Sequence, residues 1–421
     1  MTISKRFASM CLAAALALPF AARGEDAPGV FKIPGTDSTI KFYGYTQLDM
    51  TLDLGARVGD IENNDWATIL PAVPANGTAE EKHKKPQFYM TARTSRFGIQ
   101  TSTPTALGPV GVRLEGDFNG PNSFQSETFT NSVLFRLRHA YGTVGGLLAG
   151  QTWTTMIDLA AAPDTVDFNG PGTLALVRNP MLRYTFDLGQ GMTFALAAEN
   201  ARGAQFGGSK FQTLPDFHAN FGLTGSWGTL SVRGVSQYYR VFVGDADPKD
   251  KWSFAGAASG SFKLSGDTLV WQFAGGPGIG RYMLNALGVT AILPSTDPAN
   301  PNNLGGNPGG FLIGPNGDLE LVTVLGGHLG YTHVWSPAFR SNLVAAATFT
   351  LDPSIAGRPI TNDVQKQQLQ GFVNTFWTFA KNAEFGLEFT YGQWKSFSNG
   401  GAPELKGEMY RVNSTFHYNF F

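Results

Sequence analysis

The chain has 421 residues and a formal net charge of −1, with 31 basic residues against 32 acidic ones. This balance gives no general electrostatic case for binding nucleic acid. The mean hydropathy is −0.10, and no apolar run of spanning length follows the first residues, which excludes a helical membrane protein. In a transmembrane barrel, apolar and polar residues alternate along each strand, so the mean hydropathy of the chain is close to neutral.

The first 24 residues have the pattern of a secretory signal peptide. Lys5 and Arg6 precede a short apolar run over residues 10–20, and small residues follow it at the spacing of a cleavage site. We expect cleavage after Gly24, which removes Cys11 and leaves a mature chain without cysteine. Residues 25–38 are then expected to form a short periplasmic segment, and residues 39–421 a transmembrane β-barrel.

Period-two alternation marks strand after strand from residue 40 onward. Apolar and polar side chains alternate over residues 40–54, 110–118, 182–188, 385–391 and 410–420. One face of each strand is therefore expected in an apolar medium and the other in water. A sandwich exposes its polar face to bulk water, whereas a large barrel directs it into a lumen. A chain that stops just after such a strand, on bare aromatic residues, favours a lipid-facing barrel.

The connections alternate in length, as they do in outer-membrane barrels. Short turns are expected at residues 103–109, 143–146, 188–191, 226–228, 264–267, 336–338 and 380–382. Longer segments rich in Gly, Pro and Asn lie between them, and the longest cover residues 55–85, 151–180 and 275–318. The pattern predicts an all-β, antiparallel barrel of about 16 strands, with weaker strands near residues 147–151 and 268–275. A barrel of this size leaves an aqueous channel.

Arginines dominate the basic residues in one part of the chain. Residues 86–200 contain no lysine, but they contain seven arginines: Arg93, Arg96, Arg113, Arg136, Arg138, Arg178 and Arg183. By phase, Arg96, Arg113, Arg136, Arg138 and Arg183 point inward from neighbouring strands, whereas Arg93 does so only if a bulge intervenes. The arginine fork suits carboxylate or phosphate. Alternatively, these arginines only pair with the inward acids Glu115, Asp117 and Asp187.

The segment 151–180 is too apolar for an open loop and is expected to fold into the barrel. Its aspartates Asp158, Asp164 and Asp167 would then face the arginines across a constriction, to which Arg178 is also assigned. The alternative is a surface loop that packs over its own apolar residues. The acids Asp60, Glu62 and Asp65 indicate a solvated exterior loop rather than a calcium site. No catalytic residue, metal site or cofactor is predicted.

Four motifs resemble the DcaP-like porins of Gram-negative bacteria. They are RFGIQTSTP at residues 96–104, FRLRHAYG at 135–142, AGQTW at 149–153 and PDTVDFNGP at 163–171. The resemblance runs from about Thr39 to the end and implies a sixteen-stranded, trimeric diffusion channel with an inward third loop. It also implies a preference for small anions such as dicarboxylates. Two departures are the absence of coiled-coil heptads in residues 24–39 and an extra Phe421 after the terminal Phe420.

The expected location is therefore the outer membrane of the cell. The expected partners are outer-membrane lipid and lipopolysaccharide, small hydrophilic solutes, two further copies in a homotrimer, and the barrel assembly machinery through the last strand. Two other classes of function remain open. An outer-membrane hydrolase would need a nucleophile and a base, but no serine lies in a G-x-S-x-G elbow, and His139 and His333 are interpreted as interface residues. A structural or adhesive barrel would have a closed lumen.

Overall fold

The structure is a computed structural model that describes residues 28–57, 66–120, 131, 134–201, 205–206, 213–241, 247–284, 310–313, 319–351, 365–398 and 403–421. The expected signal peptide, residues 1–24, and the acids Asp60, Glu62 and Asp65 lie outside the described residues. Among the described residues, no helix is long and apolar enough to cross a membrane.

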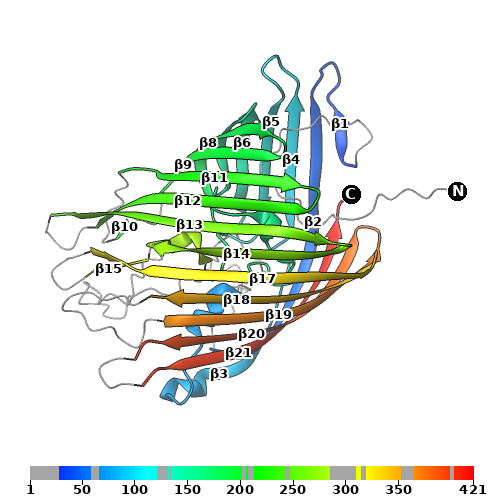
Figure 1. Cartoon of the computed structure of the whole chain (residues 1–421). Helices are drawn as coiled ribbons and strands as arrows, with labels where there is room; N and C mark the ends of the chain where they lie inside the picture. Colours follow the sequence, from blue (N-terminus) through cyan, green and yellow to red (C-terminus); the bar gives the residue numbers. More distant parts are fainter. Residues whose placement is uncertain are drawn as a thin grey trace.

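A closed antiparallel β-barrel forms the body of the protein (Figure 1). With β3 and β4 counted as one interrupted strand, sixteen strands close the barrel within the described part of the chain. These strands are β2 (Thr39–Arg57), β3 (Lys84–Thr91), β4 (Arg96–Thr103), β5 (Val110–Asp117), β6 (Arg136–Val144), β7 (Leu147–Trp153), β8 (Arg178–Gly189), β9 (Met192–Glu199), β11 (Asp216–Gly225), β12 (Gly228–Val241), β13 (Lys249–Leu264), β14 (Asp267–Pro277), β17 (Thr323–Ser336), β18 (Phe339–Thr350), β19 (Gln365–Ala380), β20 (Ala383–Ser396) and β21 (Lys406–Asn419).

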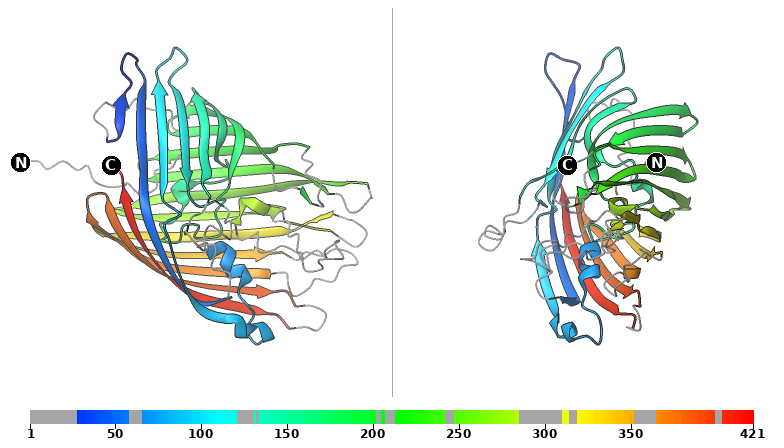
Figure 2. Two further views of the ribbon diagram at one scale, coloured as in Figure 1. Left: turned by 180° about the vertical axis from the view of Figure 1, so that it is seen from behind. Right: turned by 90° about the vertical axis from the view of Figure 1, so that its left-hand side faces the viewer.

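The barrel closes where the first long strand meets the last. β2 pairs with β21 from Tyr45 opposite Asn419 to Leu54 opposite Tyr410, and Figure 2 shows the two strands side by side in blue and red. On its other side β2 pairs first with β4 and then with β3. Closure gives each of the sixteen described barrel strands a partner on both sides, which a membrane requires of a β-structure.

All seven expected tight turns are present, at residues 104–109, 145–146, 190–191, 226–227, 265–266, 337–338 and 381–382. The two weaker strand predictions are also confirmed, as β7 and β14. Four short strands within the described residues were not predicted: β1 (Val30–Lys32), β10 (Gln205–Phe206), β15 (Phe311–Ile313) and β16 (Leu319–Leu321). β1 pairs with the start of β2, so part of the segment 25–38 joins the sheet.

Alternation is clearest in β21 and confirms the expected phase. Tyr410 and Tyr418 are 42% and 44% exposed, whereas Arg411 and Asn413 are 0% and 3% exposed. The same inversion holds in β2, where Leu52 and Leu54 are exposed and Asp49 and Asp53 are buried. Apolar side chains face outward and polar ones inward, which is the reverse of a water-soluble sandwich and is the pattern of a barrel in lipid.

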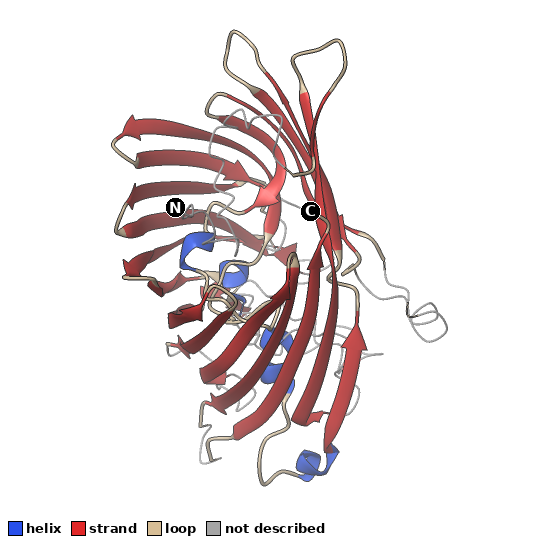
Figure 3. Ribbon diagram, turned by 90° about the vertical axis from the view of Figure 1, so that its right-hand side faces the viewer, coloured by secondary structure: helices blue, strands red, loops and turns tan. Residues whose placement is uncertain are grey.

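Apolar loop residues also pack inside the barrel, in two separate clusters. The first loop contains α1 (Trp66–Ala72), and Trp394 Nε1 donates a hydrogen bond to the carbonyl oxygen of Val73 at 3.0 Å. Trp394 and Val73 belong to a cluster that also contains Ala56, Ile69, Leu70, Val344, Phe372 and Met409. The second cluster joins Met156 and Ile157 to Ile279, Tyr282 and Met283. Figure 3 shows short helical segments, in blue, within the ring of strands.

Candidate pore-lining site

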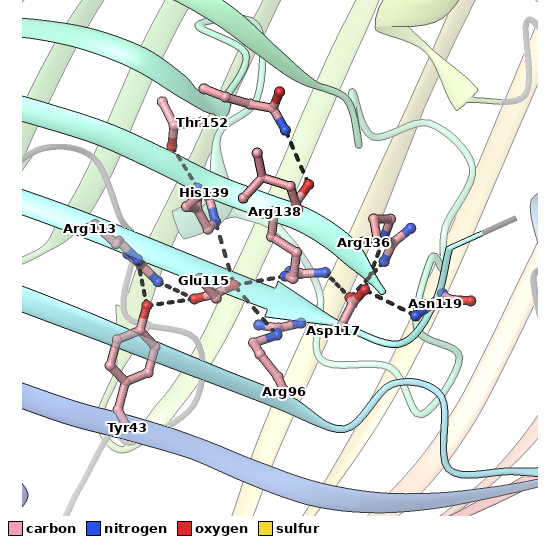
Figure 4. A network of polar contacts seen from close by, with 12 residues as sticks. Tyr43, Arg96, Arg113, Glu115, Asp117, Asn119, Arg136, Arg138, His139 and Thr152 are labelled. Carbon is pink, nitrogen blue, oxygen red and sulfur yellow. Dashed lines mark hydrogen bonds and ion pairs between the residues drawn. The ribbon is translucent and has the colours of Figure 1, made fainter. Parts of the chain in front are cut away.

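Four of the predicted arginines, which come from β4, β5 and β6, meet around two buried carboxylates of β5 (Figure 4). Glu115 accepts hydrogen bonds from Arg113 Nη2 at 2.6 Å and Arg138 Nε at 2.7 Å, and its Oε1 lies 3.5 Å from Arg96 Nε. Asp117 accepts from Arg136 Nε at 2.9 Å and Nη2 at 2.8 Å. Arg138 Nη1 also donates to Asp117 at 2.7 Å, so this arginine bridges the two acids.

Solvent reaches three of the four arginines of this cluster, whereas Arg138 and the two acids are buried. The side chains of Arg96, Arg113 and Arg136 are 17%, 14% and 31% exposed, whereas those of Glu115 and Asp117 are 1% and 0% exposed. The acids lie beneath the guanidinium groups and hold them in place by charge-assisted hydrogen bonds. The side of the cluster that contacts solvent is therefore positive.

A β-bulge shapes the cluster in a way that strict alternation does not predict. Glu115 of β5 pairs with His139, but the next residue, Gly116, pairs with Leu137, so the register shifts around Arg138. As a result Arg138 and His139 are both buried. His139 Nδ1 lies 2.9 Å from Thr152 Oγ1 and its Nε2 lies 3.7 Å from Glu115. The interpretation of His139 as an interface residue is wrong, because the bulge turns it inward.

A second irregularity accounts for Arg93, which lies between β3 and β4. Asp49 of β2 pairs with Thr91 and Tyr45 pairs with Arg96, so the interrupted strand carries one residue more than its partner. Arg93 is buried as a result. Strand phase predicted an inward Arg93 only if a bulge intervenes, and this extra residue is such a bulge.

A glycine makes room for one aromatic partner of the cluster. The Tyr43 hydroxyl donates to Glu115 at 2.9 Å and accepts from Arg113 Nε at 2.8 Å. The Tyr43 ring crosses over Gly98, where an added Cβ would lie 2.4 Å from ring atoms. A larger residue at position 98 would displace the tyrosine, because that distance is shorter than any van der Waals contact.

Arg178 and Arg183, both on β8, differ in their relation to the cluster. The Arg178 guanidinium stacks on the Trp153 ring at 3.5 Å, and the Arg138 guanidinium lies 5.8 Å from the same ring. Arg183 is buried opposite Ala197 of β9. The alternative in which the arginines pair with inward acids is confirmed for Glu115 and Asp117. Asp187, in contrast, is exposed and accepts a hydrogen bond from the Gly189 amide.

The third loop, residues 154–177, lies against the inward faces of many strands. Each of its three aspartates accepts a hydrogen bond from one of the later strands, β13, β18 or β21. Asp158 accepts from Ser259 Oγ of β13 at 2.6 Å, Asp164 from Arg340 Nε of β18 at 2.7 Å, and Asp167 from Arg411 Nη1 of β21 at 2.9 Å. The loop crosses the interior, so its acids reach strands far along the chain.

One aromatic residue of the loop does reach the arginine cluster. The Phe168 ring centre lies 5.9 Å from the Arg96 guanidinium carbon and 5.6 Å from that of Arg138, within the range of a cation–π contact. The third loop therefore lies between the arginine cluster and the wall formed by β18 to β21. The alternative of a surface loop packed over its own apolar residues does not agree with these contacts.

The loop's partner arginines were not identified from the sequence. Arg340 and Arg411 alternate with exposed Phe339 and Tyr410, and Arg233 alternates with exposed Val232, so strand phase alone could have placed all three inward. Arg233 Nη1 donates to the Met156 carbonyl oxygen at 2.6 Å. Desolvation raises the pKa of the Asp164 carboxyl above its ordinary value, and Arg340 opposes this rise. Among the described residues, no group of three or more His, Cys, Asp or Glu could hold a metal ion.

A closed sixteen-stranded barrel with an apolar exterior and a charged interior defines an outer-membrane channel protein. The model of the porin subfamily matches residues 27–417. The chain belongs to this family, and it is a porin of the outer membrane.

Solved structures share the fold at low sequence identity. The outer membrane channel DcaP of Acinetobacter baumannii is 21% identical with a TM-score of 0.70, over 93% of this chain and 99% of that one. The trimer form of OmpT from Vibrio cholerae is 10% identical with a TM-score of 0.53, over 91% and 99%. An anion-selective porin from Comamonas acidovorans is 11% identical with a TM-score of 0.53, over 91% and 100%. No curated protein matches the chain.

Proposed function

We propose that this porin is a passive diffusion channel for small hydrophilic solutes, with a mild preference for anions such as dicarboxylates. The observation that carries the proposal is the unequal exposure within the arginine cluster. Arg136 is 31% exposed, whereas its partner Asp117 is 0% exposed. A solute that passes the cluster meets guanidinium groups first, and in a narrow passage with low-dielectric walls their field raises the local concentration of anions.

The preference is expected to be mild because acids are also accessible elsewhere in the interior. Asp164 and Glu384 flank Arg340, and their side chains are 30% and 23% exposed against 16% for the arginine. These acids offset part of the positive field on the far side of the third loop. Two carboxylates on one solute suit the cluster best, because separate guanidinium forks can each bind one of them.

We further propose that the third loop narrows the channel and that the protein assembles as a homotrimer. The contacts of the loop with both walls support the first point, since a segment that spans the interior reduces the open cross-section. The trimer form of the similarly folded OmpT supports the second. Exposed aromatic side chains on β4 and next to the ends of β5 and β6, namely Phe97, Phe118 and Phe135, offer apolar surface for contacts with lipid or a second copy.

Single-channel recording in a planar bilayer tests the proposal. Reversal potentials in a salt gradient should show a mild anion preference at low ionic strength. Replacing Arg136 and Arg138 together by Ser should weaken or reverse it, whereas Asp187→Asn, near the exposed end of β8, should leave it unchanged. A clear cation preference of the unmodified channel at low salt would refute the proposed selectivity but would not affect the assignment to the porin family. A folded trimer that never conducts would favour the closed, structural barrel.

A further inference from the structure

The tip of the third loop is attached to the place where the barrel closes. Arg411 of β21 and Asp53 of β2 are register partners across the closing pair of strands. Arg411 Nε and Nη2 donate to the two oxygens of Asp53 at 2.6 and 2.9 Å, and Nη1 donates to Asp167 of the loop at 2.9 Å. All three side chains are 0–1% exposed.

The direction of the guanidinium follows from the Asp53 contact. Two of its three nitrogens bind one carboxylate in a parallel, two-point arrangement, which fixes the plane of the group. The third nitrogen is thereby aimed at Asp167. Because Asp53 and Arg411 come from the first and last barrel strands, this orientation exists only when β2 and β21 are paired in register.

A second chain of contacts joins the same loop tip to the same pair of strands. Glu388 of β20 accepts from the backbone amides of Val166 and Asp167 at 2.9 and 3.0 Å. Asn413 of β21 donates to Glu388 at 3.2 Å, and Thr51 of β2 donates to Asn413 at 3.1 Å. Both attachments of the loop tip therefore include a residue of β2.

We infer that Arg411 positions the third loop, and that it does so from the closing pair of strands, so that the loop takes its place only in a closed barrel. A buried guanidinium between two carboxylates tolerates the loss of neither partner without cost. Asp167 connects the Arg411 guanidinium to the loop, and Asp53 fixes the orientation of that guanidinium. Only the conductance measurement rests on the proposed function, because the position of the loop does not depend on the solute.

Three single substitutions separate the two roles of Arg411. Asp167→Asn removes the negative charge of the loop partner, Asp53→Asn removes that of the orienting partner together with one of its two acceptor oxygens, and Asp187→Asn is a control near the exposed end of β8. A spin label on an introduced Asn169→Cys reports the mobility of the loop tip, and the expected mature chain has no other cysteine. Heat-modifiable migration on gels reports barrel closure in the same samples.

The label should be immobile in the parent and in the Asp187→Asn protein, and should gain a mobile component in both other variants. Only Asp53→Asn should also lower the temperature at which the folded band is lost. Single channels of the Asp167→Asn protein should switch several times more often between conductance levels than the parent. If Asp167→Asn does not assemble, Arg411→Lys replaces it, because one ammonium cannot reproduce the three-point contact of the guanidinium.

Two results would overturn the inference. The first is an immobile label in folded Asp167→Asn, or in Arg411→Lys if that variant replaces it, which would show that the loop is held without the ion pair between Arg411 and Asp167. The second is a mobile label in Asp167→Asn but not in Asp53→Asn, which would show that the closing strands do not orient the anchor. A mobile label with an unchanged conductance trace would support the inference and count instead against the loop as the constriction.

Discussion

Glu115→Gln should destabilise the barrel and strengthen its anion preference at the same time. The buried Glu115 carboxylate accepts charge-assisted hydrogen bonds from Arg113 and Arg138. Bonds of this kind contribute about 1.5–3 kcal/mol each, and breaking a buried ion pair by removing one partner costs about 3–5 kcal/mol. Glutamine has the same shape but no charge, so we expect a loss of roughly 3–5 kcal/mol in the free energy of unfolding. One negative charge also disappears from beneath the exposed arginines, which should make the channel more selective for anions.

Stability and selectivity of the variant can be measured on one preparation. Urea unfolding in lipid vesicles gives the change in free energy, and reversal potentials in a salt gradient give the change in selectivity. Asp187→Asn removes a carboxylate of the same charge from the exposed end of β8 and should change neither quantity appreciably. A Glu115→Gln protein as stable as the parent, or one with a shift toward cations, would refute the view that this acid supports the arginines from below.

Further expectations concern the cluster, the loop and the assembly. Arg136→Ser should weaken the anion preference with less loss of stability than Arg138→Ser, since Arg136 is 31% exposed and Arg138 only 2%; equal losses in urea unfolding would contradict this. Replacing residues 154–177 by a short Gly/Ser linker should raise single-channel conductance in a folded barrel, and an unchanged conductance would show that the loop is not the constriction. Because desolvation raises the pKa of Asp164, mild acid should neutralise this acid before ordinary exposed aspartates and increase the anion preference; Asp164→Asn should reduce that pH dependence. The anion preference should also fade at 1 M salt, where charges are screened beyond about 3 Å, and unheated protein should migrate as a trimer on a mild gel.

Alternation predicted the wall of the barrel well because it is a local property. The inward direction of Arg113, Arg136 and Arg411 follows from their immediate neighbours, and the tight turns follow from short polar runs between strands. The bulge around Arg138 and the extra residue near Arg93 were not placed by alternation, because each depends on how many residues a partner strand supplies. A single sequence contains no count of that kind.

The partners of the third loop were beyond sequence reasoning for a different physical reason. Asp167 and Arg411 are 244 residues apart, and Asp164 and Arg340 are 176 apart. The loop was expected to face the arginines that precede it in the chain. In a closed barrel the last strands are as near to its centre as the first ones, so sequence distance does not rank the available partners.

The two apolar clusters inside the barrel bear on how the size of this channel should be judged. Phe372, Trp394 and Met409 face inward yet are dry, because α1 and its flanking residues cover them. On another part of the wall, Met156 and Ile157 shield Val235 and Val324 in the same manner. These segments thus fill part of the enclosed space with the kind of apolar packing that forms the core of a soluble protein. A permeability calculated from the number of strands would overstate what this pore admits; the volume of its inward-packed segments is the better measure.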